Sequence, residues 1–457
     1  MTVFGNQAVR DIETVLHPYT NLATHRDTGP LMLERGQGVF VYDTSGKDYI
    51  EGMSGLWCLS LGHGNEELIE AATAQLRKLS FAHLFNGKSH DPAIELAETL
   101  KALAPVPTSK VLFCNSGSEA NDTQLKLVRY MNNALGRPSK KKIVARDKAY
   151  HGVTVASASL TGLAANHADF DLPIPGILRT ACPHHYRGAQ DGESEDEFAT
   201  RLAAELEALI EAEGPETVAA FIAEPVMGAG GVVVPPASYF PKIQAVCDKY
   251  DLYVISDEVI CGFGRTGKMF GCQALGFRPD SISVAKALSS AYIPIAAVTI
   301  PEQMYEAMLV ESRKIGTFGH GFTYTGHPVA SAVALKTLEI YAREKIVEQV
   351  AAKTPQFQGH LRRLADHPLV GNTRGLGLVG GIELVADKAT KQGFDPKRGV
   401  AACCVRFAEE EGLIVRALAS DTISVCPPLV ISPAEIDEMF VRFDRALART
   451  LEWVRKG

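Results

Sequence analysis

Residues 252–259, LYVISDEV, form a short apolar run that ends in acidic residues. Three further runs have the same form: KVLFCN (110–115), KKIVARD (141–147) and VAAFIAEPV (218–226). Each has the length of a strand, and continuous apolar character is typical of strands buried on both faces of a parallel sheet. The four segments therefore predict the core strands of such a sheet.

The surrounding sequence alternates between helical and strand-like segments from Glu66 to about residue 330. This alternation predicts an α/β fold in which helices cover both faces of a mainly parallel sheet. Before it, GVFVYD (38–43) and DYIEGM (48–53) predict an antiparallel meander, and after Pro328 we expect a long helix over residues 329–346. We expect residues 61–329 to form a large domain, and residues 1–60 and 330–457 to form a smaller α+β domain from both chain ends.

Composition and charge argue against several classes of protein. The chain of 457 residues is 46% hydrophobic and 22% charged, its net charge is −7, and its basic residues are scattered, which argues against nucleic-acid binding. Its nine cysteines show no paired CxxC spacing, so neither a disulfide framework nor a metal site is expected. No signal peptide and no apolar run of about 20 residues is visible. We therefore expect a cytoplasmic enzyme that does not enter a membrane.

The carboxyl ends of the predicted strands define a candidate pocket, because ligands of open parallel sheets bind there. This pocket is expected to contain Asn115–Ser118, Tyr150, Glu224 and Asp257. Lys286 follows a further strand-like stretch, and a partly buried lysine loses its proton readily enough to act as a nucleophile. Most lysines are solvated surface charges, so this prediction depends on the neighbours of Lys286.

Two neighbouring elements suit a cofactor with a pyridinium ring and a phosphate. Asp257 ends an apolar strand, where burial is costly unless a cation such as a protonated ring nitrogen pairs with it. An ordinary aspartate bonded to a helix N-terminus is the alternative. NSGSEAND (115–122) predicts a turn and a helix start at which Ser116, Gly117 and Ser118 could bind an anion. A plain N-cap, in which Ser116 and Glu119 form a capping box, fits the same residues.

Aromatic and apolar residues could enclose the ring of such a cofactor. Tyr150 and His151 follow the strand at 141–147 and would place an aromatic face over a planar ring. Val259 lies two residues after Asp257, on the same side of the strand, and would contact the opposite face. A core valine is the alternative interpretation.

The ordered segments NSGSEAND, AYHG, AEPVMGAGGVVVPP, SDEVICGFGRTG, AKALSS and GFTYTGHPVASA resemble the class III aminotransferases. Within that family they resemble the omega-transaminase branch, which works on amines with pyruvate, and the resemblance runs from about Tyr42 to Pro428. It implies a fold-type I architecture, pyridoxal 5'-phosphate (PLP) as the cofactor, and a homodimer whose active sites are shared across the interface. Dimers of this kind could pair further into tetramers.

The resemblance also implies roles for individual residues. Lys286 would form the Schiff base with PLP and act as the catalytic base, while Asp257 would pair with the pyridine nitrogen. Gly117 and Ser118 would hold the phosphate, and Glu224 would lie near the ring hydroxyl. Phe322 and Thr323 would contact the phosphate from the partner subunit. The residues expected to bind substrate are Trp57, Phe85, Tyr150, Ala229 and Arg416, of which Arg416 would bind the carboxylate of the acceptor.

The expected reaction is the transfer of an amino group from a primary amine or omega-amino acid to a keto acid, with pyruvate as the expected acceptor. A racemase or aminomutase would use the same cofactor and fold, and a non-catalytic cofactor-binding module is a third alternative. The donor stays open among aryl-alkyl amines, diamines, β-alanine and taurine. Two GxGxxG matches, Gly262–Gly267 and Gly375–Gly380, do not favour a dinucleotide site. No clear long helix opens directly after Gly267, and the second match merges into the apolar stretch LVGGIELV.

Overall fold

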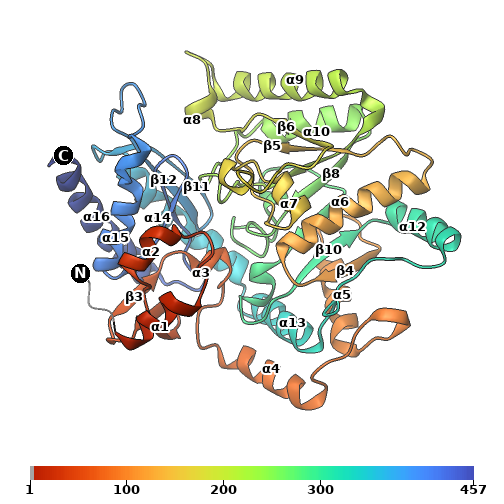
Figure 1. Cartoon of the computed structure of the whole chain (residues 1–457), viewed down its shortest axis with the longest axis horizontal. Helices are drawn as coiled ribbons and strands as arrows, with labels where there is room; N and C mark the ends of the chain where they lie inside the picture. The colour runs from red at the N-terminus through yellow and green to blue at the C-terminus, as the bar shows by residue number, and fades with distance from the viewer. Residues whose placement is uncertain (1–4, 457) are drawn as a thin grey trace.

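The computed structural model describes residues 5–456, in which the largest sheet has seven strands in the order β4-β10-β9-β8-β7-β5-β6 (Figure 1). Strands β5 to β9 run parallel, whereas β10 runs antiparallel between β9 and β4. The bounds are β4 (Lys110–Cys114), β5 (Lys142–Arg146), β6 (Ile177–Thr180), β7 (Val218–Ala223), β8 (Tyr253–Asp257), β9 (Ser281–Val284) and β10 (Ala296–Ile300). All four apolar runs predicted as strands lie in this sheet.

Alternate residues of these strands belong to two apolar clusters, one on each face of the sheet. In β7, Phe221 packs with one cluster, whereas its neighbours Ala220 and Ile222 pack with the other. The first cluster includes residues of α9 (Glu195–Glu213), α10 (Tyr239–Lys249) and α13 (Pro328–Arg343). The second includes residues of α6 (Gly117–Ala134), α7 (Val155–Leu160) and α12 (Glu302–Ile315). Burial on both faces explains why these strands are apolar without alternation.

The N-terminal and C-terminal parts of the chain form two smaller sheets and meet in one of them. Strands β1 (Leu33–Gln37), β2 (Phe40–Asp43) and β3 (Asp48–Glu51) form the predicted antiparallel meander, and β13 (Leu413–Ile414) pairs with β3 in parallel. The other sheet contains β11 (Val370–Leu376), β12 (Val379–Leu384), β15 (Thr422–Val425) and β14 (Arg416–Leu418). The predicted fold class is therefore confirmed, while the domain boundaries at residues 60 and 329 stay a prediction.

Helices complete both parts of the molecule. The C-terminal part carries α14 (Ile346–Leu364), α15 (Val400–Glu410) and α16 (Pro433–Arg455), which lie together beside β11 and β12 in Figure 1. The other helices are α1 (Asn6–Thr14), α2 (Leu22–Thr28), α3 (Ser54–Trp57), α4 (Glu66–Lys78), α5 (Asp91–Leu103), α8 (His185–Gly188) and α11 (Gly271–Ala274). Within residues 5–456, none of the helices has the length and apolar character that crossing a membrane requires.

The helix predicted over residues 329–346 was wrong at its C-terminal end. Helix α13 stops at Arg343, and Lys345 adopts a left-handed conformation with φ of 53°. This conformation cannot continue a right-handed helix, so a separate helix, α14, begins at Ile346.

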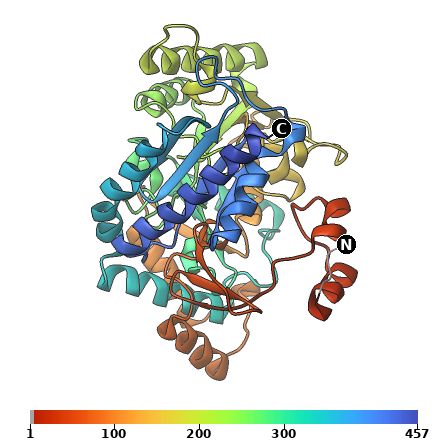
Figure 2. The same ribbon diagram turned by 90° about the vertical axis from the view of Figure 1, so that its left-hand side faces the viewer.

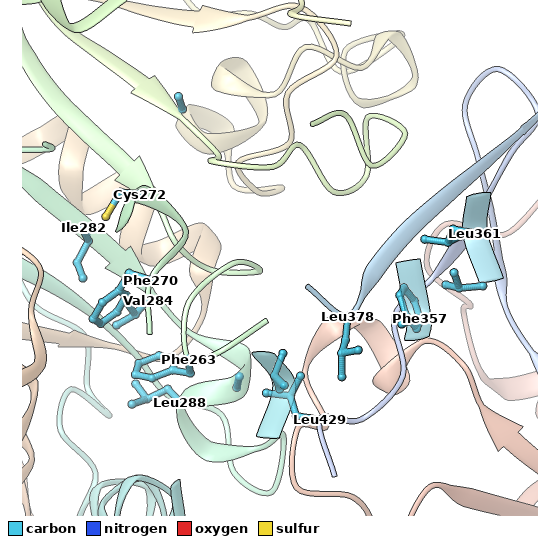
Figure 3. Close-up of a cluster of buried hydrophobic side chains, with 14 of the residues drawn as sticks. Phe263, Phe270, Cys272, Ile282, Val284, Leu288, Phe357, Leu361, Leu378 and Leu429 are labelled. Carbon is cyan, nitrogen blue, oxygen red and sulfur yellow. The ribbon is translucent and has the colours of Figure 1, made fainter. Parts of the chain in front are cut away.

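One buried apolar cluster continues from the large sheet into the C-terminal part (Figure 3). Ile282 and Val284 of β9 belong to it, as do Phe357 of α14 and Leu378 of the turn between β11 and β12. The two parts therefore share a continuous apolar core instead of meeting across a solvated interface. Figure 2 shows that α1 and α2, by contrast, lie together at one side of the molecule.

Candidate active site

A cavity of about 550 Å³ opens beyond the carboxyl ends of the parallel strands. It brings together predicted residues from α6, from the segments that follow β5, β7, β8 and β9, and from the N- and C-terminal parts of the chain. These residues are Trp57, Gly117, Ser118, Tyr150, His151, Glu224, Ala229, Asp257, Val259, Lys286 and Arg416. Of the residues that the rule for parallel strands placed in a pocket, Gly117, Ser118, Tyr150, Glu224 and Asp257 line this cavity, whereas Asn115 and Ser116 do not.

Lys286 lies in this cavity two residues after β9 and is partly buried. Burial lowers the pKa of Lys286 below its usual value, because the charged ammonium form loses its hydration. Its Nζ lies 5.4 Å from the centre of the Trp57 ring. The backbone of Lys286 has a φ of 51°, which is unusual for a residue with a side chain. A buried amine with a lowered pKa can act as a nucleophile and as a base.

Asp257 is buried at the end of β8 and is held by three hydrogen-bonding groups. Its Oδ2 accepts a hydrogen bond of 2.7 Å from Asn121 Nδ2 and lies 2.8 Å from His151 Nδ1, while its Oδ1 accepts from the Val259 amide. Asn121 Nδ2 also donates to the carbonyl oxygen of His151. The sequence interpretation missed Asn121, although it lies one turn after Gly117 on the same face of α6.

The sequence NSGSEAND suggested either an anion site or a plain N-cap at the start of α6, and the structure shows features of both. Ser116 Oγ accepts a hydrogen bond from the Glu119 amide, but the Glu119 carboxylate accepts from the Asn115 amide instead of completing the capping box. Ser116 therefore serves as the N-cap and does not line the cavity, whereas Gly117 and Ser118 do. A Cβ at Gly117 would lie 2.9 Å from Val259 Cγ1, so a side chain there would displace the cavity wall.

The polar groups of the cavity fit the phosphate, the aldehyde and the ring nitrogen of PLP. The first amides of α6 offer unpaired N–H groups at the positive end of a helix dipole, which suits a phosphate. The buried amine of Lys286 suits an aldehyde, and the carboxylate of Asp257 suits a protonated ring nitrogen. The residues present therefore fit the cofactor that the resemblance implies.

Glu224 connects two walls of the cavity. Its Oε1 accepts a hydrogen bond of 2.9 Å from the Tyr150 amide, and its Oε2 accepts one of 2.9 Å from the Gly228 amide. Burial raises the pKa of Glu224 above its usual value. Its carboxylate thus fixes the segment of Tyr150 relative to the segment that carries Ala229.

Arg416 of β14 presents a cation to the cavity without a carboxylate partner in residues 5–456. Its guanidinium carbon lies 5.2 Å from the Trp57 ring centre and 5.9 Å from that of Tyr19. Burial lowers the pKa of Arg416. Tyr19, which also accepts a hydrogen bond from Asn166 Nδ2, was not predicted, because nothing in the N-terminal sequence indicates that it reaches the cavity.

The cavity of this chain does not include Phe85, Phe322 or Thr323. Phe85 instead lines a second cavity of about 420 Å³, together with Phe318 and Gly321. Its side chain is exposed. The predicted roles of these three residues therefore need a second subunit.

A buried ion pair supports the cavity wall that carries Ala229. Arg374 of β11 donates through Nε to the carbonyl oxygen of Gly231 at 2.8 Å and through Nη1 to Glu383 at 2.7 Å. Glu383 is fully buried and also accepts a hydrogen bond of 2.6 Å from Arg187 Nε. The C-terminal sheet thus holds a loop of the large domain in place.

Replacing Arg374 with glutamine is expected to lower the free energy of unfolding by about 3–5 kcal/mol, because Glu383 loses one of its buried partners. The matched control is Arg363→Gln, which breaks an exposed pair with Asp444 and should cost less than about 1 kcal/mol. Urea unfolding of both variants measures the difference. If the two substitutions lowered the free energy of unfolding by the same amount, the stabilising role of the buried Arg374–Glu383 pair would be wrong.

Glu51 is a buried carboxylate next to the segment that carries Trp57. It accepts a hydrogen bond of 3.0 Å from the Met53 amide, and burial raises its pKa from 4.5 to about 7. The segment after it is strained, since Ser54 and Trp57 have φ values of 48° and 58°. Glu51 was not among the predicted site residues.

Because the pKa of Glu51 is higher in the folded chain than in the unfolded chain, its contribution to stability is greatest below pH 4.5 and is lost as the pH rises to about 7. Above pH 7 the charged form should cost up to about 3 kcal/mol. Glu51→Gln is therefore expected to be more stable than the parent protein at pH 8.5, an advantage that shrinks as the pH falls. Thermal unfolding at pH 5.5, 7 and 8.5 tests this, and a constant difference between the proteins would exclude titration of Glu51 as its source.

Comparisons with known proteins agree with this geometry. A family model described as "Aminotransferase class-III" matches residues 22–447. Gamma aminobutyrate transaminase 3, chloroplastic, of Solanum lycopersicum is 51% identical over 437 residues, which cover 95% of this chain and 84% of that protein. The omega transaminase of Pseudomonas jessenii, solved in complex with PMP, is 53% identical with a TM-score of 0.97 and covers 99% of this chain and 100% of its own. A transaminase solved with L-Ala is 54% identical with a TM-score of 0.91, covering 93% of this chain and 100% of its own.

Proposed function

This chain belongs to the class III aminotransferases, and from that premise we propose that it transfers an amino group from a primary amine or omega-amino acid to pyruvate. It is a PLP-dependent transaminase. The observation that carries the finer proposal is the Arg416 guanidinium, which has no carboxylate partner among residues 5–456 and lies in the same cavity as the amine of Lys286. A guanidinium matches a carboxylate with two parallel hydrogen bonds. This supports a substrate with one reacting end and one carboxylate end.

Two relatives support the choice of substrates. One structural neighbour was solved with L-Ala, which is the aminated form of pyruvate. Curated relatives are named gamma aminobutyrate transaminases, and gamma-aminobutyrate is an omega-amino acid whose carboxylate could also bind Arg416. Trp57 and Ala229 leave an apolar space that suits an uncharged amine substituent.

In the proposed mechanism, bound PLP supplies an aldehyde that takes up the amino group and a ring that withdraws electrons from the substrate carbon. Lys286 is the residue that would hold the aldehyde, and its free amine would remove the proton from the substrate carbon and pass it to the carbon that receives the amino group. Asp257 would present its carboxylate to the ring nitrogen, with its orientation fixed by Asn121 and His151. Gly117 and Ser118, at the start of α6, would hold the phosphate through their amides.

A homodimer is part of the proposal. Phe85, Phe322 and Thr323 lie outside the cavity of their own chain, which supports roles in the cavity of a partner subunit. Light scattering on the purified protein would give the mass of a dimer or of a tetramer built from dimers, and a monomer that is fully active would exclude shared sites. A cytoplasmic location stays a prediction.

A donor panel tests the reaction. The PLP-loaded protein is incubated with pyruvate and, in turn, an aryl-alkyl amine, a diamine, β-alanine, taurine and gamma-aminobutyrate, and L-alanine formation is measured. We expect alanine with at least one donor and no product when either substrate is omitted. Product formed without a keto acid would indicate an aminomutase or racemase instead.

Replacing Arg416 with alanine is expected to lower kcat/KM for pyruvate by about 10- to 100-fold, since a hydrogen bond to a charged group contributes roughly 1.5–3 kcal/mol. The first half-reaction with an uncharged aryl-alkyl amine should change little. Stopped-flow measurement of the two half-reactions separates these effects. If Arg416→Ala slowed both half-reactions equally, the carboxylate role would be wrong.

A further inference from the structure

Three potential metal ligands meet in the N-terminal segment, outside the active-site cavity. Asp11 belongs to α1, His17 to the loop that follows it, and His25 to α2. His17 Nε2 lies 2.7 Å from Asp11 Oδ1, and His25 Nε2 lies 3.5 Å from the same oxygen. The two imidazole rings are 4.3 Å apart at their centres.

The arrangement leaves one buried nitrogen unsatisfied. His25 is only 9% exposed, and its Nε2 has no hydrogen-bond partner within residues 5–456. A buried polar atom without a partner costs about 1–3 kcal/mol of stability, so such an atom calls for an explanation. Asp11 forms a hydrogen bond with His17 Nε2, whereas His25 Nε2 lies 3.5 Å from the same carboxylate oxygen without a hydrogen bond to it.

The three ligand atoms lie close to the spacing that a tetrahedral metal ion requires. All of them are within 4.8 Å of one another. Zinc bound by nitrogen and oxygen at about 2.0–2.1 Å places its ligand atoms roughly 3.3 Å apart. Small side-chain rotations would therefore bring both Nε2 atoms and the Asp11 oxygen onto one ion. Two imidazoles and a carboxylate suit Zn²⁺ better than Ca²⁺ or Mg²⁺, which prefer oxygen ligands alone.

We propose that Asp11, His17 and His25 bind one Zn²⁺ ion, with water as the fourth ligand. Helices α1 and α2 have little apolar contact to hold them together, because Ala8 is the one buried residue of α1 and His25 the one buried residue of α2. The ion takes the place of an apolar core between the two helices, which stand at one side of the molecule (Figure 2).

The site also has a consequence for the active-site cavity. Tyr19 lies in the loop between the metal ligands His17 and His25, and its ring lines the cavity beside Arg416. Binding of Zn²⁺ fixes both ends of this loop. The ion therefore stabilises the position of Tyr19 while taking no part in amino transfer.

Zinc binding to the PLP-loaded protein tests the proposal without any turnover. After treatment with EDTA and gel filtration, isothermal titration with Zn²⁺ should show one tight equivalent per chain. His25→Gln and Asp11→Asn should each weaken that equivalent by at least about 10-fold. The matched control is His360→Gln, because His360 also contacts a carboxylate, that of Asp437, but its pair has no second histidine. The control should bind Zn²⁺ as the parent protein does.

Trypsin cleavage after Arg26 gives a second readout that is specific for the segment. Zn²⁺ should slow this cleavage in the parent protein and in His360→Gln, but not in His25→Gln or Asp11→Asn. The proposal is overturned if the parent protein binds no tight equivalent, if His25→Gln and Asp11→Asn bind as tightly as the parent, or if cleavage is insensitive to Zn²⁺. A failure of the proposed substrates would leave these results unchanged, because neither measurement involves amino transfer.

Discussion

Lys286→Ala is expected to lower kcat for amino transfer by at least about 10³-fold, because Lys286 is proposed both to hold the cofactor covalently and to act as the base. Its amine lies in the cavity, where burial lowers its pKa and so favours the neutral form that can act as a nucleophile and as a base. Alanine offers neither a nucleophile nor a base at this position, and no second lysine lines the cavity among the described residues.

Single-turnover measurements with an amine donor and with pyruvate would separate the two roles of Lys286. PLP should still bind to Lys286→Ala through the phosphate and ring contacts, but proton transfer should be lost. Lys268→Ala, which removes an exposed lysine, is the control and should retain the parent rate. Transaminase turnover by Lys286→Ala within a few-fold of the parent would refute the assignment.

Asp257→Asn is expected to lower kcat by about 10²–10³-fold, which is typical when one preorganised electrostatic contact is removed. The substitution keeps the shape of the side chain and its contact with Asn121, but it removes the charge that would keep the ring nitrogen protonated. The absorbance of the bound cofactor should therefore change its dependence on pH, an effect that a purely structural role would not produce.

Spectrophotometric pH titration of the PLP-loaded protein and steady-state kinetics measure both effects. Asp280→Asn is the matched control, because Asp280 accepts a hydrogen bond from the Val254 amide of β8 but lies outside the active-site cavity. If both variants lost activity to the same degree, or if Asp257→Asn left the spectrum unchanged, the pairing with the ring nitrogen would be wrong.

Much of the fold could be predicted because the buried strands differ plainly from the rest of the sequence. LYVISDEV and the three similar runs are apolar on both faces, and such runs leave few alternatives to a parallel sheet covered by helices. The end of α13 could not be predicted, because nothing in the residues around Lys345 requires a left-handed backbone there. The antiparallel direction of β10 likewise depends on pairing with β4, far away in the sequence.

Some residues of the candidate site could likewise be predicted from the sequence, and others could not. Gly117 and Asp257 stand at the beginning or end of predicted elements, so a topological rule placed them in the pocket, whereas Lys286 was predicted from the strand-like stretch before it and from the family resemblance. Asn121, Tyr19 and Arg374 act through contacts between distant segments, and each resembles an ordinary surface residue when only the sequence is considered. Long-range contacts of this kind are set by the packing of the whole chain.

The wall that carries Ala229 is anchored on both sides, by the bond from the Gly228 amide to Glu224 and by the bond from Arg374 to Gly231. The side chain at position 229 can therefore change in size while the main chain around it stays in place. The residues proposed for the chemistry, Lys286 and Asp257, come from other strands and do not depend on this wall. With the proposed role of Ala229 in substrate binding, single substitutions at this position would change the substrate range without rebuilding the groups proposed to move the proton.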